Sequence, residues 1–296
     1  MSPTESPDQP PIFPAREEWD LVIRPASGWW ELNLGDVWKY RDLLLMFVRR
    51  DFVSVYKQTV LGPLWFFLQP LFTTLVFTAV FSGMAKIPTE GHPPLLFYLA
   101  GTTAWNYFST CLSKTATTFT ANANLFGKVY FPRLITPISI VVSSLVQFSI
   151  QFILFAGIWI YYLVTGSGVD PDWFGIILLT PVLVVLMGLL GLGCGITISS
   201  LTSKYRDFHF LVNFGIQLMM YGTPVIYSLN IAPEKYRPWI EANPMSPIIE
   251  CFRGIYLGSG VWNAHTLGYA TVVTLAILAL GLLLFNRISK TFMDTV

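Results

Sequence analysis

The chain contains few charged residues. Only 12% of its 296 residues are Asp, Glu, Lys or Arg, compared with roughly 25% in an average soluble domain. Its 18 basic and 17 acidic residues give a formal net charge of +1. No basic stripe of the kind that nucleic-acid-binding proteins carry is visible. The composition therefore argues against both a soluble globular protein and a nucleic-acid binder.

Motifs that carry enzymatic chemistry are also missing. The sequence has no GxxxxGK[ST] phosphate-binding loop, no HExxH zinc motif, no GxSxG motif and no paired catalytic carboxylates. The three cysteines, Cys111, Cys194 and Cys251, form no CxxC pair and are interpreted as small packing residues. We expect no catalytic residue, no metal and no cofactor bound by this chain. The first residues also lack the basic start and apolar core of a signal peptide, so no cleaved leader is expected.

Six long stretches of the chain contain no Asp, Glu, Lys or Arg. They are 58–85, 91–113, 134–169, 173–203, 208–233 and 254–286. Each is long enough to cross the apolar core of a bilayer, which needs about 20 mostly apolar helical residues. A spanning segment must satisfy its own backbone hydrogen bonds, so helix is expected. The sequence predicts an all-α, polytopic membrane protein with six transmembrane helices.

Basic residues are distributed unequally over the segments between these runs. With the N-terminus placed in the cytoplasm, fourteen Lys and Arg residues fall on the cytoplasmic side and four on the other side. The positive-inside rule then favours two cytoplasmic termini, in agreement with an even number of spans.

The segment 36–57 before the first run predicts a helix of its own. Apolar side chains recur on one side at 3.6-residue spacing, and basic side chains gather on the other. The apolar side consists of Val37, Tyr40, Leu44, Phe47, Val48 and Val55. Such a helix suits the cytoplasmic membrane interface, and a soluble helix packed on another domain is the alternative.

Two loops on the expected cytoplasmic side carry distinctive residues. The loop 122–133 holds Phe126, Tyr130 and Phe131, which either contact a partner protein or fold back onto the helices. The loop 201–209 holds a compact charged cluster, which is either a contact site or an ordinary membrane-boundary island.

The segment 231–262, on the expected outer side, predicts a short helix that ends at Gly258. Apolar residues occupy one face of this helix, and Glu250 and Arg253 are spaced three apart, close enough to pair. We interpret it as a re-entrant element; an interfacial loop with anchoring aromatics is the alternative.

Four stretches together resemble the membrane subunits of polysaccharide exporters of the ABC-2 permease family. They are RRDFVSVYKQTVLGPLWFFLQPL (49–71), NLFGKVYFPRLITPIS (124–139), KYRDFHFLVNF (204–214) and NPMSPIIECFRGIYLG (243–258). They occur in the order of that family and between the corresponding runs, over roughly residues 30–290. The subunits that export O-antigen polysaccharide are the nearest likeness, with capsule and teichoic-acid exporters as relatives.

The resemblance implies a homodimer in the bacterial inner membrane, bound to two copies of a separate ABC ATPase that holds ATP and Mg²⁺. The chain itself is then not an enzyme. Its cargo is expected to be a polysaccharide linked to an undecaprenyl-type lipid, moved from the cytoplasmic to the periplasmic side. The implied divisions are a cytoplasmic tail (1–35), an interface helix (36–57), a transmembrane domain (58–290) that includes 231–262, and a cytoplasmic C-terminus (291–296).

The resemblance also assigns residues to roles. ATPase coupling is expected to involve Arg49, Arg50, Asp51, Tyr56, Lys57, Phe126, Lys128, Tyr130, Phe131, Arg133, Lys204, Arg206 and Asp207. Candidates for the channel lining or exit are Trp105, Tyr107, Phe108, Tyr221, Tyr227, Glu250, Phe252, Arg253 and Tyr256. Aromatic rings can stack on the apolar faces of sugars, although Trp and Tyr also serve as ordinary membrane-interface anchors.

Other functions remain open at this stage. An ABC-2 permease for capsule or teichoic-acid polymer, or for a drug or small lipid, would share this architecture. A membrane glycosyltransferase or O-antigen polymerase is a further alternative, but it would be expected to show catalytic residues in a sizeable loop.

Overall fold

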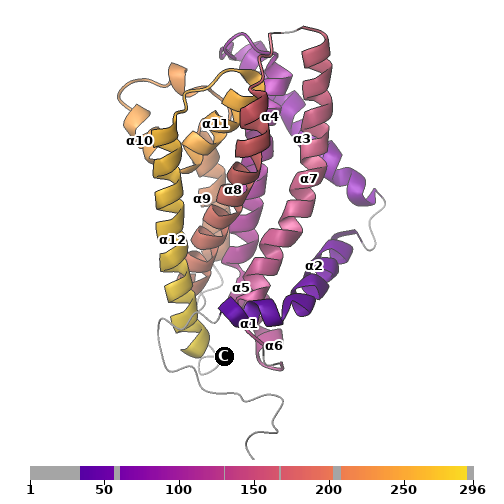
Figure 1. Ribbon diagram of the computed structural model, residues 1–296, viewed down its shortest axis with the longest axis vertical. Helices are drawn as coiled ribbons and strands as arrows, with labels where there is room; N and C mark the ends of the chain where they lie inside the picture. Colours follow the sequence, from indigo (N-terminus) through magenta and orange to yellow (C-terminus); the bar gives the residue numbers. More distant parts are fainter. Residues whose placement is uncertain (1–33, 57–60, 130, 167, 203–207, 292–296) are drawn as a thin grey trace, which may run out of the picture. The chain divides into compact units, whose positions relative to one another are not determined.

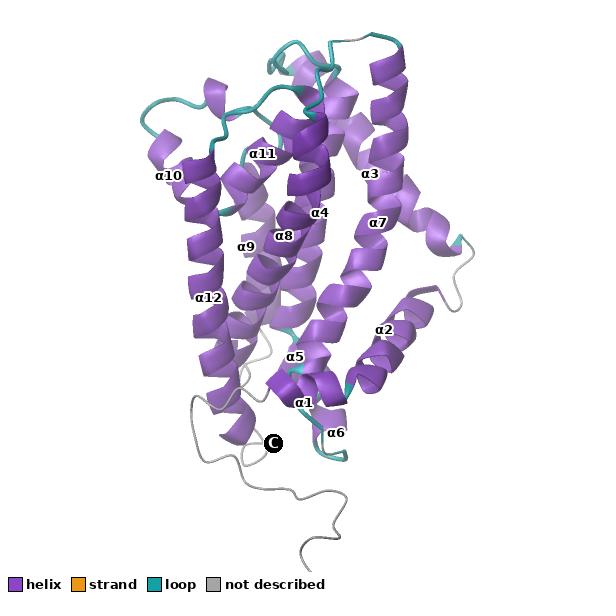
Figure 2. Cartoon of the chain, viewed as in Figure 1, coloured by secondary structure: helices purple, strands orange, loops and turns teal. Residues whose placement is uncertain are grey.

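Helices make up the regular structure of the residues that the computed structural model describes, which are 34–56, 61–129, 131–166, 168–202 and 208–291. Figure 2 draws no strand among them, which confirms the all-α expectation for this part of the chain. The helices, of which Figure 1 labels those named α, are α1 (Leu34–Lys39), α2 (Arg41–Tyr56), η2 (Gly62–Leu64), α3 (Trp65–Phe77), η3 (Thr78–Met84), α4 (Pro94–Ala116), α5 (Thr118–Ala121), α6 (Ala123–Phe126), α7 (Ile135–Val164), α8 (Trp173–Thr202), α9 (Phe208–Tyr221), η4 (Leu229–Ile231), α10 (Arg237–Ala242), α11 (Met245–Leu257) and α12 (Ala264–Thr291). Here η2 and η4 are 3₁₀ turns and η3 is a π-helix.

Four helical stretches are long and apolar enough to cross a membrane. They are Trp65–Met84, which joins α3 to η3, then α7, α8, and Ala264–Ile288 of α12. Each overlaps one of the charge-free runs. At about 1.5 Å per residue, the 30 residues of α7 and of α8 extend about 45 Å. That exceeds the roughly 30 Å apolar core of a bilayer, so these helices have room to tilt or to project beyond it.

The remaining two runs form helices of a different character. Helix α4 occupies the run 91–113 but is not among the four apolar helices. It is instead enclosed by the others: every residue from Leu96 to Trp105 is buried, and α4 packs against α3, α7, α8, α9 and α11. The run 208–233 contains the 14 residues of α9 and then turns at Gly222, so it does not continue as one helix to residue 233.

The run 254–286 overlaps the expected outer segment 231–262, and the structure divides it between two helices. Residues 254–257 complete α11, and the spanning helix α12 begins only at Ala264. Gly258 ends α11 in the left-handed region with φ 81°, as the sequence predicted. A Cβ there would lie 2.5 Å from the Asp170 carbonyl oxygen, so the position also requires a residue without a side chain.

Helix α8 places glycines against two neighbouring helices. A Cβ at Gly191 would lie 2.6 Å from Cys111 Cβ of α4, and a Cβ at Gly193 would lie 2.9 Å from Leu278 Cα of α12. Small residues let helix backbones approach closely where no hydrophobic driving force acts between them. Helix α8 is therefore close-packed on both sides.

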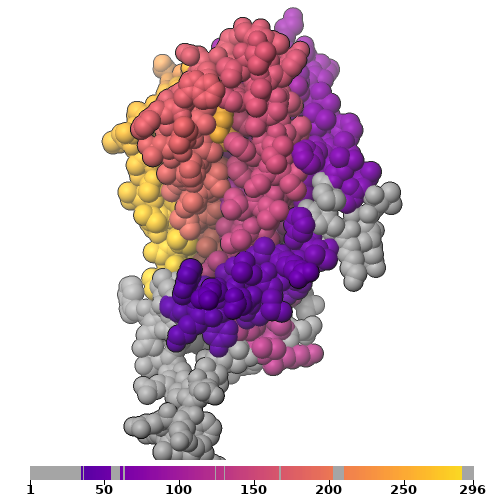
Figure 3. Space-filling view, turned by 45° about the vertical axis from the view of Figure 1, so that its right-hand side comes forward, coloured from indigo at the N-terminus to yellow at the C-terminus, as the bar shows by residue number. Residues whose placement is uncertain are grey.

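The segment 36–57 is helical but interrupted. Tyr40 forms a turn between α1 and α2, and Lys57 lies outside the described residues. Helix α2 packs against α7, and Figure 3 shows α1 and α2 as an indigo band across the face in view. The expected tail 1–35 lies almost wholly outside the described residues.

Candidate functional site

Two groups of side chains stand out, one near each end of α4. One surrounds Phe119, just after α4 ends, and the other surrounds Phe97, in its first turn. The 23 residues of α4 extend about 35 Å, so the two groups lie roughly a membrane thickness apart.

The first group is a phenylalanine cluster, formed by Phe47, Phe119, Phe126, Phe131 and Phe285. Phe47 of α2 meets Phe131 edge to face, with ring centroids 5.7 Å apart. Phe126 lies 5.8 Å from Phe131 and 6.1 Å from Phe119. Phe119 stacks on Phe285 of α12 at 4.6 Å. The cluster therefore ties α2, the segment 118–131 and α12 together.

Local turns bring these rings into one place. After α4, helices α5 and α6 are single turns, separated at Asn122, whose side-chain amide donates to the Thr118 carbonyl at 2.9 Å. The chain then reverses, with Phe131 packed inward before α7 starts at Ile135. Each aromatic pair contributes about 0.5–1.5 kcal/mol beyond its burial.

The predicted coupling residues divide into two kinds. Phe126 and Phe131 are buried within their own chain, which favours the interpretation that this part of the loop folds back onto the helices. Lys128 and Val129 between them face outward, and the Val129 side chain is 54% exposed. The buried rings hold the loop in its conformation, and Lys128 and Val129 are the residues that remain accessible on its surface.

Basic side chains lie over the cluster. The Arg50 guanidinium carbon is 4.6 Å from the Phe47 ring centroid, and Arg50 also binds the Asp51 carboxylate at 2.8 Å. The Arg133 guanidinium carbon is 5.7 Å from the Phe126 ring centroid. Arg49 is exposed on α2. The arrangement gives the phenylalanine cluster a positively charged rim.

Five of the predicted coupling residues lie outside the described residues. They are Lys57, Tyr130, Lys204, Arg206 and Asp207. Tyr56 ends α2, and only its backbone is described.

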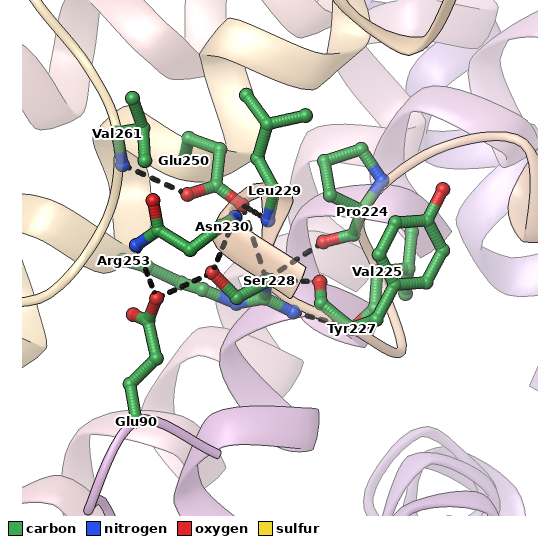
Figure 4. Close-up of polar contacts among 10 residues, drawn as sticks. All are labelled: Glu90, Pro224, Val225, Tyr227, Ser228, Leu229, Asn230, Glu250, Arg253 and Val261. Atoms are coloured by element: carbon green, nitrogen blue, oxygen red, sulfur yellow. Dashed lines mark hydrogen bonds and ion pairs between the residues drawn. The ribbon is translucent and has the colours of Figure 1, made fainter. Parts of the chain in front are cut away.

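The second group is a polar network around Arg253 of α11, drawn in Figure 4. The Arg253 side chain is 1% exposed, and its guanidinium carbon lies 3.8 Å from the Phe97 ring centroid. Its Nη1 donates to the carbonyls of Pro224 at 2.7 Å and Tyr227 at 3.1 Å, and Nη2 donates to the Val225 carbonyl. Arg253 thereby fixes the chain that follows α9.

Glu250 is the charge partner of Arg253. The two side chains are 3.5 Å apart, so the spacing of three did predict a pair. Glu250 also accepts hydrogen bonds from the backbone N–H groups of Leu229 at 3.3 Å and Val261 at 3.0 Å. The structure departs from a one-sided amphipathic helix, because every residue of α11 except Gly254 is buried. Helices α4, α8 and α12 enclose it.

Sequence reasoning missed Glu90, which completes the network. Its carboxylate accepts hydrogen bonds from Ser228 Oγ at 2.5 Å and from Asn230 Nδ2 at 2.6 Å. Burial acts to raise the pKa of Glu90, but these two bonds, the nearby Ser259 hydroxyl and the charge of Arg253 together outweigh it, and the pKa lies below its ordinary value. The only available signal was an isolated carboxylate between two apolar runs.

The predicted channel aromatics occupy different environments. Trp105, Tyr107, Phe108, Phe252 and Tyr256 are buried in the chain's own core. Tyr256, for example, contacts the rings of Phe152, Phe155 and Trp159. Its backbone carbonyl accepts a hydrogen bond from Trp159 Nε1 at 2.8 Å. Tyr221 is 56% exposed at the end of α9, and Tyr227 is half-buried beside it, with its hydroxyl donating to the Tyr221 carbonyl at 3.3 Å.

Within the described ranges, no three His, Cys, Asp or Glu side chains gather closely enough to hold a metal ion. The two groups of side chains join segments that are far apart in the sequence and hold the backbone in place.

Comparison with known proteins gives the following matches. A protein-family model described as "ABC-2 type transporter" matches residues 42–257. An O-antigen export system permease protein of Klebsiella pneumoniae is 27% identical over 264 residues, which cover 88% of this chain and 96% of that protein. One from Myxococcus xanthus is 26% identical over 88% of this chain and 98% of its own length. A capsule polysaccharide export inner-membrane protein of Neisseria meningitidis is 22% identical over 81% of this chain and 89% of its own.

Proposed function

The chain belongs to the ABC-2 type transporter family, and we propose that it is the channel subunit of an exporter for lipid-linked, O-antigen-like polysaccharide. Membrane subunits of this family do not hydrolyse ATP themselves. The family therefore implies a separate ATPase partner, which accounts for the missing phosphate-binding loop in the sequence.

The observation that carries the proposed cargo is the extent of the similarity. Two relatives named as O-antigen export permeases align with 88% of this chain and with 96% or more of their own length. The aligned region thus takes in the spans, the loops and the polar network together.

In the proposed assembly, two copies of this chain bind two ATPase subunits in the inner membrane. Each copy crosses the membrane six times, by α3 with η3, α4, α7, α8, α9 and α12. The fourteen-to-four distribution of basic residues supports two cytoplasmic termini. Helix α2, α6 and the phenylalanine cluster then lie on the cytoplasmic side, and α10 and α11 on the periplasmic side.

The cytoplasmic end supplies the proposed coupling contact. Lys128 and Val129 are the outward residues of a loop whose base is fixed by Phe126 and Phe131. A push on this loop reaches α2 through Phe47 and α12 through Phe285. The alternative of a soluble helix packed on another domain is disfavoured, because α2 packs on α7 of the transmembrane domain.

The periplasmic end supplies the proposed exit. Tyr221 and Tyr227 remain the candidates for contact with sugar rings, because Tyr221 is largely exposed and Tyr227 adjoins it. Arg253 and Glu250 act there as supports for the backbone of segment 222–231 rather than as groups that touch the polymer. The five buried aromatics serve the packing of the single chain.

A capsule polysaccharide is the second candidate cargo. It is favoured by the similarity to the Neisseria meningitidis protein, which covers 81% of this chain. The membrane glycosyltransferase alternative is disfavoured by the family match, since ABC-2 membrane subunits work as transporters.

Deletion of the gene, followed by analysis of the surface polymers, tests the proposal. We expect loss of the lipopolysaccharide-linked long-chain polysaccharide and accumulation of its lipid-linked precursor inside the cell, with recovery when the wild-type chain is restored. Loss of a capsule instead would support the second candidate. Normal surface polymers, or failure of the tagged chain to co-purify with any ATPase, would overturn both.

A further inference from the structure

We propose that Glu90 is a positioning residue that holds segment 222–231 closed against the loop 85–93, and that its release is a step in export. The inference rests on the proposed function and adds a contact that breaks and re-forms at the proposed periplasmic exit of the exporter. It concerns two loops that are about 140 residues apart in sequence and are joined in the network of Figure 4.

Glu90 joins the loop before α4 to the chain after α9. Its Oε1 accepts from Ser228 Oγ at 2.5 Å and from Asn230 Nδ2 at 2.6 Å. Ser228 in turn accepts from the backbone N–H of Asn230 at 3.2 Å, which forms the start of η4. One carboxylate oxygen thus anchors the turn that leads into α10.

The backbone at Glu90 is held in an unfavourable conformation. Glu90 has φ 54°, and Lys86 at the other end of the same short loop has φ 53°. Residues with a Cβ rarely adopt this left-handed region, because the Cβ approaches the following carbonyl. The two hydrogen bonds offset this strain, so the loop relaxes when they break. A strained conformation held by one exposed and one part-buried bond is suited to a two-state element.

The contacts around Glu90 and those around Arg253 differ in how completely they are buried. Arg253 and Glu250 are each 1% exposed, and they hold Pro224, Val225 and Leu229 in a close-packed layer against α4. A Cβ at Gly101 of α4 would lie 2.6 Å from the Val225 carbonyl oxygen. Glu90 is only half-buried and Asn230 is exposed, so water can replace the bond between these two side chains, whereas Ser228, the second partner of Glu90, is itself 1% exposed.

The hydrogen bonds that Glu90 makes to segment 222–231 will therefore break before those that Arg253 makes to it. Parting there frees Ser228, Asn230 and the stretch that leads to α10. The backbone N–H of Leu229 then keeps only its 3.3 Å bond to Glu250, while Pro224, Val225 and Tyr227 stay bound to Arg253. Helix α10 has few partners of its own; it packs mainly on α11, and Trp239 on it is 80% exposed. A small outer flap, rather than the whole α11 layer, is the part that moves.

A reversible cross-link tests whether release is required. In a Glu90→Cys/Asn230→Cys variant, a short bifunctional methanethiosulfonate reagent joins the two loops, and mass spectrometry gives the cross-linked fraction. We expect polymer export by the ATPase complex in proteoliposomes to fall at least ten-fold in the cross-linked protein and to return after reduction. A monofunctional reagent of similar size, applied to the same variant, should give the same export rate as the untreated variant. Undiminished export by cross-linked protein would overturn the proposal.

The same experiment separates this proposal from the proposed function. If the wild-type complex moves no polymer, the assigned function fails. If the wild-type complex and the reduced variant move polymer and the cross-linked variant does so equally well, only the role of Glu90 fails.

A labelling experiment covers the case in which the double variant does not fold. Leu229 is 4% exposed in the closed arrangement. With Leu229→Cys as reporter, Glu90→Ala should increase the rate of modification by a membrane-impermeant thiol reagent about ten-fold, and Glu90→Gln, which keeps an acceptor oxygen, should increase it much less. Equal rates in all three backgrounds would overturn the proposal, since a residue needed only for stability would not change local access in the folded protein.

Discussion

Phe47 of α2 and Phe131 of the loop before α7 pack edge to face, with their ring centroids 5.7 Å apart. The two rings come from segments more than eighty residues apart, and both are buried. This contact packs α2 directly against the proposed coupling loop. A movement of the loop cannot leave α2 in place without exposing one of the rings.

The loop residues should separate by function according to the direction of their side chains. We expect Val129→Asp to abolish most of the permease-dependent stimulation of the partner ATPase while leaving the melting temperature unchanged, because Val129 is 54% exposed. ATPase activity and thermal unfolding of the purified complex provide the measurement.

Phe131→Ala is the matched comparison for Val129→Asp. Removal of this 6% exposed ring should destabilise the chain by about 3–5 kcal/mol, because a buried cavity is left behind. If instead Val129→Asp unfolds the chain and Phe131→Ala leaves its stability intact, the division into inward and outward residues is wrong.

The buried pair of Arg253 and Glu250 should behave as a coupled unit. Arg253→Met leaves the Glu250 carboxylate buried without its partner, and we expect a loss of about 3–5 kcal/mol. Glu250→Gln combined with Arg253→Met should cost less than the sum of the two single changes. Thermal unfolding of the four proteins in detergent closes this double-mutant cycle.

An exposed pair provides the control for that cycle. Arg237 and Glu241 are 2.9 Å apart, but their side chains are 36% and 48% exposed. We expect Arg237→Met to change the stability by no more than about 0.5 kcal/mol. Additive effects at the buried pair, or a large effect at the exposed pair, would contradict the assigned roles.

Gly191 should tolerate no side chain. The Cβ of Gly191→Ala would lie 2.6 Å from Cys111 Cβ and 2.9 Å from the Phe108 carbonyl oxygen, so α8 and α4 would have to move apart. We expect a loss of about 1–3 kcal/mol, measured by thermal unfolding. At Gly157 of α7 a Cβ meets nothing within 4 Å, so Gly157→Ala should be neutral or slightly stabilising. A neutral Gly191→Ala would show that the two helices are not in close contact.

Acidification should weaken the contact at Glu90. Burial acts to raise its pKa, but the bonds from Ser228 and Asn230 and the charge of Arg253 bring the folded-state pKa below the ordinary value of 4.5. The unfolded chain therefore takes up the proton first as the pH falls. The stabilisation is complete above about pH 4.5 and is lost as the pH falls through the folded-state pKa. The melting temperature of wild type should thus fall more steeply than that of Glu90→Gln below about pH 4.5. Parallel pH profiles would show that Glu90 does not contribute in this way.

The sequence predicted the class of this protein because its signal is compositional. A run without charge must avoid water over its whole length, and helix is the structure that satisfies its backbone there. The four co-linear stretches predicted the family, and the spacing of Glu250 and Arg253 predicted their pairing. Local chemistry was also sufficient at Gly258, where a helix ends in the left-handed region.

Composition alone did not predict those helix boundaries that depend on packing against other helices. Nothing in the absence of charge shows that the run 254–286 is split between α11 and α12, or that α9 stops at Tyr221. Aromatic residues in a span likewise look the same whether they face a channel or a neighbour. Only the contacts of Tyr256 with four other rings reveal that it is a core residue.

By itself, then, the sequence determined the membrane class, the helical content and the family, since each follows from properties that a segment carries wherever it is placed. Tertiary structure alone decided that Phe47 meets Phe131 and that Glu90 reaches Ser228 and Asn230. These contacts join residues roughly 84 to 140 positions apart. They exist because α4 packs against α7, α8 and α11, and α12 packs against α8, so that segments far apart in the sequence meet at the two ends of α4. No local sequence pattern records this packing.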